Sequence, residues 1–375
     1  MTPARALLGC LLTLCCLAGS ATAGPPPTVD ARAWLVEDQS TGEVLAAHAD
    51  REQVPIASIT KLMTVIVALE HHELTDVVSV DPRAAAVGDE TIDLSPRESI
   101  TVGDLVKGAL IQSANDAADA LALATAPSFS AFAELMNAKA LELGLTDSQF
   151  VRPDGLDAYG AYSSARDVTR LAEAAMNVPV IRRTVDEVTD TIEGGRALHT
   201  WNDLLDVFPG VVGVKTGHTS AAGWSQVAAV RGAGTTIYAT ILGSPTRSRR
   251  NSDLESLIAY GLAQYRTVDA IATGRDYADV RLPYGRTPLA LVATAPLATV
   301  VRLGHTLTER VVAPVSVSLP VRQGDVLGHV QVWAGAHLLG QRPLVASRSV
   351  ATPGVGGRIG WYARRTVHHV VGLFS

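Results

Sequence analysis

The spacing of hydrophobic residues predicts two short strands followed by a group of helices. Apolar runs at Ala33–Val36 and Val44–Ala47 flank the turn sequence Gln39–Gly42, an arrangement typical of a β-hairpin. From Ser58 to about Glu70, apolar side chains recur at intervals of three and four residues, which predicts a helix with one buried face. The same spacing and typical end signals predict further helices at Val102–Gln112, Asn115–Ala124, Ser130–Leu143 and Ser164–Met176.

Strands return after these helices, and they predict that both ends of the region share one sheet. Apolar runs at Trp224–Val230 and Thr236–Leu242 are typical of strands, and a helix from about Leu254 to Tyr265 follows them. Strands that frame helices in this way favour an α/β domain whose sheet holds the first and last strands together. Residues 28–267 are therefore predicted to form one α/β domain.

The pattern changes after Thr267. Apolar and polar residues alternate at Val315–Leu319 and at His329–Val332, with glycines at intervals typical of turns, so residues 268–350 are predicted to form a small β-rich domain. Residues 355–375 then have a helical pattern that places apolar and aromatic side chains on one face and arginine and histidine on the other. We expect this amphipathic helix to lie on an anionic membrane surface without spanning it; the alternative is a helix packed on the β-rich domain.

The first 23 residues have the order of a secretory signal peptide. Arg5 precedes the apolar run Ala6–Ala18, and the small-residue triplet Ala21–Ala23 is typical of a cleavage site. The alternative is a buried N-terminal helix. Cleavage would leave a mature chain without thiols, because all three cysteines lie in this segment, at positions Cys10, Cys15 and Cys16. No later apolar run reaches the ~18 residues of a spanning helix, so we expect an exported, periplasmic protein.

Composition excludes one large class of function. The formal net charge is -6, aromatic residues make up 5% of the chain, and no run of lysine or arginine occurs. A nucleic-acid-binding protein needs a basic surface and residues that stack on bases, so we expect no nucleic-acid partner. The ten histidines show no metal-binding spacing, so we expect no metal and no cofactor.

Two lysines belong to short motifs that can carry out nucleophilic chemistry. The chain has only four lysines among its 31 basic residues. Lys61 ends the motif Ser58-Ile59-Thr60-Lys61, and the i, i+3 spacing on a helix puts the serine hydroxyl and the lysine amine on the same side. Lys215 begins Lys215-Thr216-Gly217 just before a predicted strand, and Ser113-Ala114-Asn115 lies between the two motifs.

A serine hydroxyl is a weak nucleophile and needs a base within hydrogen-bond reach. Lys61 can serve if burial and a second cation, here Lys215, destabilise its charged form. A helix N-terminus at Ser58 would aim backbone N–H groups at a developing oxyanion, and Gly217 is expected to let a substrate backbone approach closely. The alternative is an N-cap serine, a surface lysine and an ordinary turn, which requires three coincidences.

The ordered set S-x-x-K, S-x-N and K-T-G resembles that of the penicillin-recognising serine enzymes. With Gly155-Leu156-Asp157 and Ser163–Asp167, the chain is similar more particularly to low-molecular-mass penicillin-binding proteins, the D-alanyl-D-alanine carboxypeptidases of the S11 peptidase family. Gly328–Ser347 resembles the β-rich second domain of that family. The resemblance implies an α/β β-lactamase/transpeptidase-like domain, with an antiparallel sheet and a helical cluster, followed by a small all-β domain and a C-terminal amphipathic helix.

The resemblance also implies a role for each motif residue in removing the terminal D-Ala from peptidoglycan stem pentapeptides. Ser58 attacks the carbonyl of the penultimate D-Ala, Lys61 takes its proton, and Ser113 relays a proton to the leaving amine. The remaining residues bind substrate: Asn115 holds the amide, Lys215, Thr216 and Gly217 meet the terminal residue and its carboxylate, and the N–H groups of Ser58 and His218 form the oxyanion hole. Arg250 is assigned to the same carboxylate; the alternative is a solvated loop containing Arg247, Arg249 and Arg250.

Penicillins and other β-lactams are expected to acylate the same serine, and the implied biological role is cell-wall remodelling and cell shape. The alternatives are a class A β-lactamase, a D,D-endopeptidase of the same superfamily and an inactive muropeptide-binding protein. The region Gln149–Asp154 contains no glutamate that could activate the deacylating water of a β-lactamase. The intact Ser58, Lys61 and Lys215 argue against an inactive protein.

Overall fold

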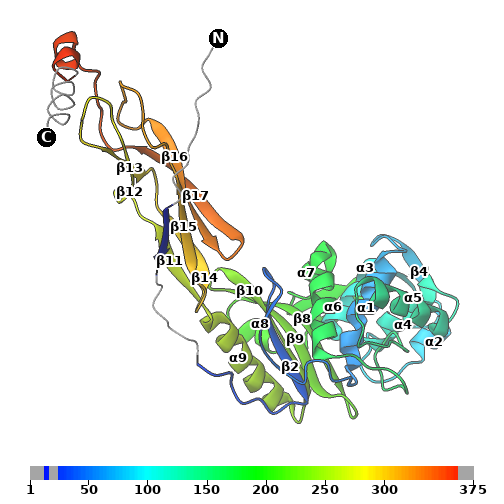
Figure 1. Cartoon of the computed structure of the whole chain (residues 1–375). Helices are drawn as coiled ribbons and strands as arrows, with labels where there is room; N and C mark the ends of the chain where they lie inside the picture. The colour runs from blue at the N-terminus through cyan, green and yellow to red at the C-terminus, as the bar shows by residue number, and fades with distance from the viewer. Residues whose placement is uncertain (1–11, 17–23, 362–375) are drawn as a thin grey trace. The chain divides into compact units, whose positions relative to one another are not determined.

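The computed structural model describes residues 12–16 and 24–361. Contacts divide the chain into two compact units between Gln264 and Tyr265. Gly24–Gln264 form the first, which we call the α/β unit, and residues 12–16 belong with the part that begins at Tyr265, which we call the β unit (Figure 1).

A five-stranded antiparallel sheet forms the centre of the α/β unit. Its strand order is β3-β2-β10-β9-β8, so the first and last strands share the sheet, as the sequence predicts. The N-terminal hairpin is confirmed, and β2 pairs with β10 with Leu35 opposite Thr240. The strands are β2 (Ala33–Asp38), β3 (Glu43–His48), β8 (Val211–Thr219), β9 (Gly223–Gly232) and β10 (Thr235–Ser244).

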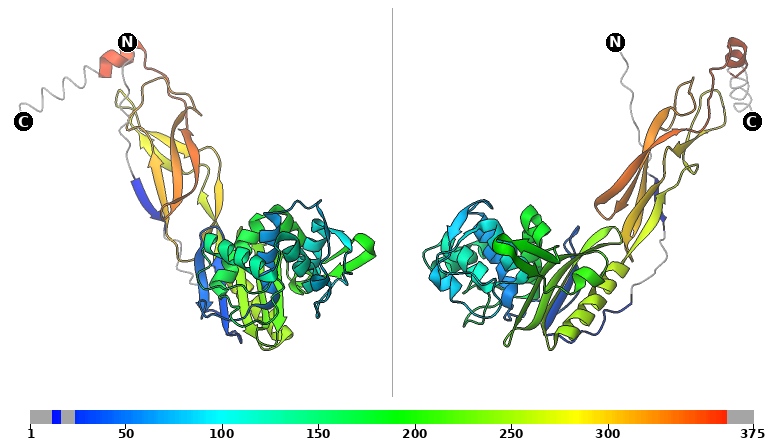
Figure 2. Two further views of the ribbon diagram at one scale, coloured as in Figure 1. Left: turned by 90° about the vertical axis from the view of Figure 1, so that its right-hand side faces the viewer. Right: turned by 180° about the vertical axis from the view of Figure 1, so that it is seen from behind.

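Helices cover both faces of this sheet. On one face α6 (Ala165–Asn177) packs through Thr169, whose hydroxyl lies 2.6 Å from that of Thr240. On the other face α9 (Arg247–Ala263) places Gly261 against Ile237. Because Ile237 and Thr240 are three residues apart on β10, their side chains point to opposite faces. The unit therefore has three layers, with the larger group of helices on the α6 side (Figure 2).

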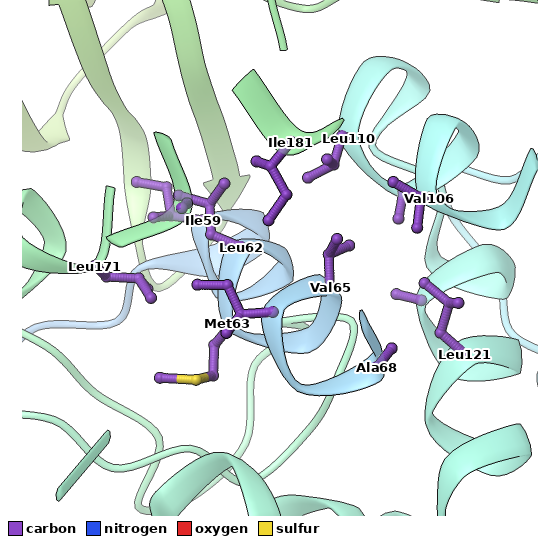
Figure 3. Packing of buried hydrophobic residues seen from close by; sticks show 14 of the residues in the cluster. Ile59, Leu62, Met63, Val65, Ala68, Val106, Leu110, Leu121, Leu171 and Ile181 are labelled. Carbon is purple, nitrogen blue, oxygen red and sulfur yellow. The ribbon is translucent and has the colours of Figure 1, made fainter. Parts of the chain in front are cut away.

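The helix that follows Ser58 is more deeply buried than its sequence pattern predicts. A short 3₁₀ turn, η1 (Ala57–Thr60), leads into α1 (Lys61–Leu69), and the side chains from Lys61 to Ala68 are all buried or nearly so. Figure 3 shows Val65 facing Val106 and Leu110, while Met63 points to the other side of the helix. A helix with apolar residues all round belongs in a core, so Lys61 enters the protein with it.

The helical cluster around α1 agrees with the predicted helices to within a few residues, except that the helix predicted at Val102–Gln112 changes from α to π geometry after Lys107. Its members are α2 (Pro82–Ala85), α3 (Val102–Lys107), the π-helical turn η2 (Gly108–Gln112), α4 (Asn115–Thr125), α5 (Phe129–Glu142) and α7 (Pro179–Thr184). Smaller elements are β4 (Val77–Ser79), β5 (Ser99–Thr101), β6 (Thr189–Ile192), η3 (Glu193–Gly195), β7 (Arg196–His199) and α8 (Leu204–Val207).

The β unit confirms the predicted small β domain. Its main sheet has the order β1-β15-β16-β17-β13-β12, and β11 pairs with β14. A core containing Val280, Leu291, Val330 and Leu344 fills the unit. The strands are β1 (Leu12–Cys16), β11 (Tyr265–Ile271), β12 (Asp276–Val280), β13 (Leu289–Ala293), β14 (Leu297–Arg302), β15 (Leu307–Val312), β16 (Val326–Ala334) and β17 (His337–Ala346).

Both terminal predictions fall partly outside the described residues. Residues 1–11 and 17–23 of the predicted signal peptide lie outside them, and residues 12–16 form β1, which pairs with β15. The alternative of an N-terminal helix is therefore wrong for residues 12–16. Residues 355–361 are helical, and the rest of the predicted amphipathic helix, residues 362–375, lies outside the described part. No helix among the described residues is long and apolar enough to cross a membrane.

Candidate active site

The structure brings Ser58 and Lys61 together in a buried site. Ser58 lies in η1 and Lys61 is the first residue of α1, so the helical spacing places the Lys61 amine 2.8 Å from the Ser58 hydroxyl. The amine also donates to Asn115 Oδ1 at 2.8 Å and to the carbonyl oxygen of Asp154 at 2.6 Å. Three oxygen atoms therefore fix the amine beside the nucleophile.

Two glycines hold the nucleophile's backbone. A Cβ on Gly155, whose φ is +82°, would lie 2.2 Å from the carbonyl oxygen of Ala57, and one on Gly217 would lie 2.5 Å from that of Ile56. Ala57 itself has a φ of +50°, a conformation that costs a non-glycine residue energy unless its surroundings enforce it. The missing side chain of Gly217 therefore makes room for the chain's own backbone at the start of η1, while close approach of a substrate backbone to Gly217 stays a prediction.

Ser113 and Lys215 form a second serine–lysine pair. Ser113 ends η2 in a left-handed conformation, with a φ of +65°, and its hydroxyl accepts a hydrogen bond from the Lys215 amine at 2.8 Å. Lys215 lies inside β8, whereas the sequence pattern placed it before a strand. The buried lysine and the glycines at positions 213 and 217 interrupt the apolar alternation that reveals a strand. Because β8 is an edge strand, it can present Lys215 to Ser113 and Gly217 to η1.

A cleft of about 190 Å³ opens over these groups. It contains predicted site residues from four separate segments and three residues that sequence reasoning missed, Glu90, Trp201 and Trp224. Its lining consists of Ser58, Glu90, Ser113, Trp201, Thr216, Gly217, His218, Trp224 and Arg250. The imidazole of His218 stacks on the Trp224 ring with centroids 3.9 Å apart, so the Trp224 ring supports the end of β8 at the cleft.

Arg250 lies in the cleft and not in a solvated loop. The side chain is buried, with 1% of the residue exposed, and its guanidinium donates to Asp203 at 3.0 Å and to Asn251. Its neighbours Arg247 and Arg249 are more exposed and pair with Asp203 and Asp253. Thr246 caps α9, because its hydroxyl accepts a hydrogen bond from the N–H of Arg249. The helix therefore begins about two turns before the predicted start at Leu254 and includes all three arginines, so the loop alternative is wrong.

A slightly larger hollow of about 240 Å³ lies beside the cleft, between Pro55–Ala57 and the segment from Gln149 to Tyr162. Its lining includes none of Ser58, Lys61, Ser113 and Lys215, so the smaller cleft is the site of the chemistry. Within residues 12–16 and 24–361, no group of three His, Cys, Asp or Glu side chains could hold a metal ion.

Comparison with known proteins agrees with this geometry. Residues 20–246, more than half of the chain, match the family model of the D-alanyl-D-alanine carboxypeptidases, peptidase family S11. The chain belongs to this family. The D-alanyl-D-alanine carboxypeptidase DacC of Escherichia coli (strain K12) is 32% identical over 372 residues, which cover 92% of this chain and 90% of the relative. The predicted family resemblance and fold class are therefore confirmed.

Solved structures of penicillin-binding proteins match the fold as well. Penicillin binding protein 5 from Haemophilus influenzae is 26% identical, with a TM-score of 0.63 over 88% of this chain and 100% of that structure. Penicillin-Binding Protein D2 from Listeria monocytogenes, solved in an ampicillin-bound form, is 28% identical with a TM-score of 0.58, covering 63% of this chain and 99% of its own.

Electrostatics distinguish the two lysines of this S11 site from ordinary surface lysines. Burial lowers the pKa of Lys61 to about 8, although the carboxylates of Asp154 and Asp119 oppose the shift. Burial also lowers the pKa of Lys215, and the positive charges of Lys61 and Arg250 lower it further. Burial lowers the pKa of Arg250 to about 10, so this side chain remains charged at neutral pH. A neutral amine beside Ser58 is therefore accessible near physiological pH.

Proposed function

We propose that this chain is an exported serine-type D-alanyl-D-alanine carboxypeptidase that removes the terminal D-Ala from peptidoglycan stem pentapeptides through an acyl-enzyme on Ser58. The observation that carries the proposal is the Ser58 hydroxyl 2.8 Å from the buried amine of Lys61, in a cleft also lined by Ser113, which accepts a hydrogen bond from the buried Lys215. β-Lactams acylate the same serine and inhibit the enzyme.

Acylation begins when neutral Lys61 accepts the proton of the Ser58 hydroxyl as its oxygen bonds to the carbonyl carbon of the penultimate D-Ala. The backbone N–H groups of Ser58 and His218 hold the negative oxygen that forms. Collapse of this intermediate breaks the C–N bond, and Ser113, hydrogen-bonded to Lys215, passes its proton to the leaving D-Ala amine and takes up the proton that Lys61 accepted from Ser58, so that both groups return to their starting state. Water then attacks the ester, releases the shortened peptide and returns the proton to Ser58.

The cations of the cleft favour removal of a terminal residue over cleavage inside a cross-link. Lys215 and the adjacent Thr216 are buried, and the buried Arg250 lines the same cleft as Thr216. A terminal carboxylate neutralises buried cations, whereas the neutral amide at that position in an endopeptidase substrate does not. Lys215, Thr216 and Arg250 therefore bind the carboxylate, and Asn115 holds the substrate amide.

Mass spectrometry of a stem pentapeptide incubated with the purified protein tests this function. We expect loss of one D-Ala from the pentapeptide and a stable covalent adduct with a labelled penicillin. Ser58→Ala should abolish both signals while its circular dichroism spectrum stays that of the wild type. Undiminished labelling of the Ser58→Ala protein would refute the nucleophile, and an intact pentapeptide would refute the carboxypeptidase activity.

We further propose that the enzyme is exported by a signal peptide at residues 1–23 and stays on the outer face of the cytoplasmic membrane. Cleavage after Ala23 would remove β1 and leave β15 at the edge of its sheet. N-terminal sequencing of the protein recovered from the periplasm should therefore begin at Gly24. A chain that retains Met1 would contradict the signal peptide.

Membrane attachment through the C-terminal helix is supported by the apolar side chains that the start of this helix exposes. Val355 and Ile359 are 74% and 63% exposed, and Trp361 packs edge-on against Tyr284 of the β unit. Removing residues 356–375 should release an active enzyme from the membrane fraction. Equal sedimentation of truncated and complete protein with membranes would refute the anchor.

A further inference from the structure

One carboxylate lies in a cleft whose other charged groups are cations. Glu90 lines the cleft with Ser58, Ser113 and Arg250, and its negative charge acts on both Lys61 and Lys215. No other residue in the cleft lining is acidic. The proposed roles of the motif residues leave this carboxylate without a function.

The backbone fixes Glu90 to the S-x-N motif. The carbonyl oxygen of Glu90 accepts a hydrogen bond from the N–H of Asn115 at 2.7 Å, and the Asn115 side-chain amide donates to the carbonyl oxygen of Gly88 at 3.0 Å. The segment that contains Gly88 and Glu90 is thus held to Asn115 by one backbone and one side-chain hydrogen bond. A substrate amide that reaches Asn115 therefore passes close to Glu90.

The Glu90 carboxylate is available to a ligand. The residue is half-buried, and within the described residues it forms no ion pair. A carboxylate in a partly desolvated cleft gains from a cationic partner, and here the protein supplies none in direct contact. The terminal carboxylate of the substrate cannot be that partner, because like charges repel. The partner must therefore come from the acyl side of the substrate, on the other side of the scissile bond.

We propose that Glu90 selects stem peptides whose residue before D-Ala-D-Ala carries a free side-chain ammonium. The inference rests on the proposed carboxypeptidase function. In the proposed binding mode the terminal carboxylate is at Lys215, the scissile carbonyl at Ser58 and a substrate amide at Asn115. The preceding residue then comes close to the segment that Glu90 shares with Asn115, and a flexible four-carbon side chain can bring its ammonium to Glu90.

This charge also distinguishes two states of the cell wall. A stem whose side-chain amine is free carries an ammonium at this position, whereas a stem in which that amine is acylated, as in an amide cross-link, carries no charge there. Glu90 therefore directs the enzyme to stems whose amine is still free.

A glutamate in such a cleft could instead activate the water that hydrolyses the acyl-enzyme. That role requires the carboxylate to act on every substrate, charged or neutral, because the ester on Ser58 is the same in each. Substrate selection requires it to act on the charged substrate alone. The two roles therefore give opposite results with a matched pair of substrates.

The test uses the full-length protein and two peptides, Nα-acetyl-L-Lys-D-Ala-D-Ala and its Nε-acetylated counterpart, with D-Ala release as the assay. We expect the wild type to have a kcat/KM about five-fold higher for the free amine, the effect of one partly exposed ion pair. Glu90→Gln should bring the ratio close to one. Asp89→Asn is the matched control, because it removes the same charge from the neighbouring, exposed residue, and it should keep the wild-type ratio.

A wild-type ratio of one, or an unchanged ratio in Glu90→Gln, overturns the inference while leaving the carboxypeptidase function intact. Accumulation of acyl-enzyme by Glu90→Gln with both peptides also overturns it and identifies a water-activating base. Release of D-Ala from neither peptide by the wild type overturns the proposed function together with the inference. Benzylpenicillin, which has no ammonium, should still acylate Glu90→Gln, and this shows that the variant is folded.

Discussion

The pKa of Lys61 makes a quantitative prediction about how fast Ser58 reacts at different pH values. Lys61 is completely buried, and its pKa falls from 10.5 to about 8 because burial destabilises the ammonium. Only the neutral amine can accept the serine proton. With this pKa, about 1% of the amine is neutral at pH 6, about 9% at pH 7 and about half at pH 8.

The second-order rate constant for acylation by a penicillin should therefore rise about 50-fold between pH 6 and pH 8. The constant should increase about nine-fold from pH 6 to pH 7 and about five-fold from pH 7 to pH 8. Stopped-flow or rapid-quench labelling at subsaturating penicillin measures this constant and reports groups of the free enzyme. Burial raises the pKa of Asp119 to about 8, so its carboxylate helps to keep Lys61 protonated mainly towards pH 8 and above, and Asp119→Asn should shift the upper part of the rise to lower pH.

A rate constant that stays flat from pH 6 to pH 8 would refute Lys61 as the base with a lowered pKa. A rise that continues unchanged towards pH 10 would show that burial in the folded enzyme does not lower the pKa of this amine. Asp104→Asn is a control for the Asp119 substitution. It removes a carboxylate in the first turn of α3 that is not among the charges acting on Lys61, so it should leave the profile in place.

Three further predictions concern stability and the cleft. Between pH 8 and pH 10.5, Lys61 is mostly neutral in the folded protein and mostly protonated in the unfolded protein. Stability should therefore increase with pH across this range. Urea titrations of the wild type and of Lys61→Met should show the difference between their free energies of unfolding rising by about 3 kcal/mol. Gly217→Ala should slow acylation about 100-fold, because its Cβ would displace Ile56 and the adjoining nucleophile, whereas Gly88→Ala, with no atom within 4 Å, should not. Lys215→Ala should weaken acylation strongly, and Lys215→Arg should not restore it, because a planar fork replaces a point charge; equal rates for wild type and Lys215→Ala would end the carboxylate role.

Local sequence patterns determined the elements of this protein. The N-terminal hairpin, the helical cluster, the β domain and the S-x-x-K turn of a helix all depend on residues a few positions apart, and short-range spacing is what an amino-acid sequence displays directly. The three motifs also indicated the family, because the ordered set S-x-x-K, S-x-N and K-T-G matches that of the penicillin-recognising serine enzymes.

Tertiary packing decided what those elements do together. Ser58, Ser113 and Lys215 meet because β8 packs beside η1 and its Lys215 donates a hydrogen bond to Ser113, and nothing in the spacing of distant segments shows such contacts. Burial of α1 on all sides sets the pKa of Lys61, although its sequence pattern indicated only one buried face.

The same reasoning explains the residues that the sequence left out or misplaced. Arg250 occurs in a run of arginines that is typical of a solvated loop, yet the cap at Thr246 turns that run into a helix and buries this one side chain. Glu90 belongs to no motif, and Gly155 occurs in a segment that the sequence connected only with the family resemblance. They matter only because folding places one carboxylate in a cationic cleft and one glycine against the backbone of the nucleophile. The sequence alone determined which chemistry is present, and the fold decided where each charge lies, since electrostatic free energies depend on burial and distance and not on position along the chain.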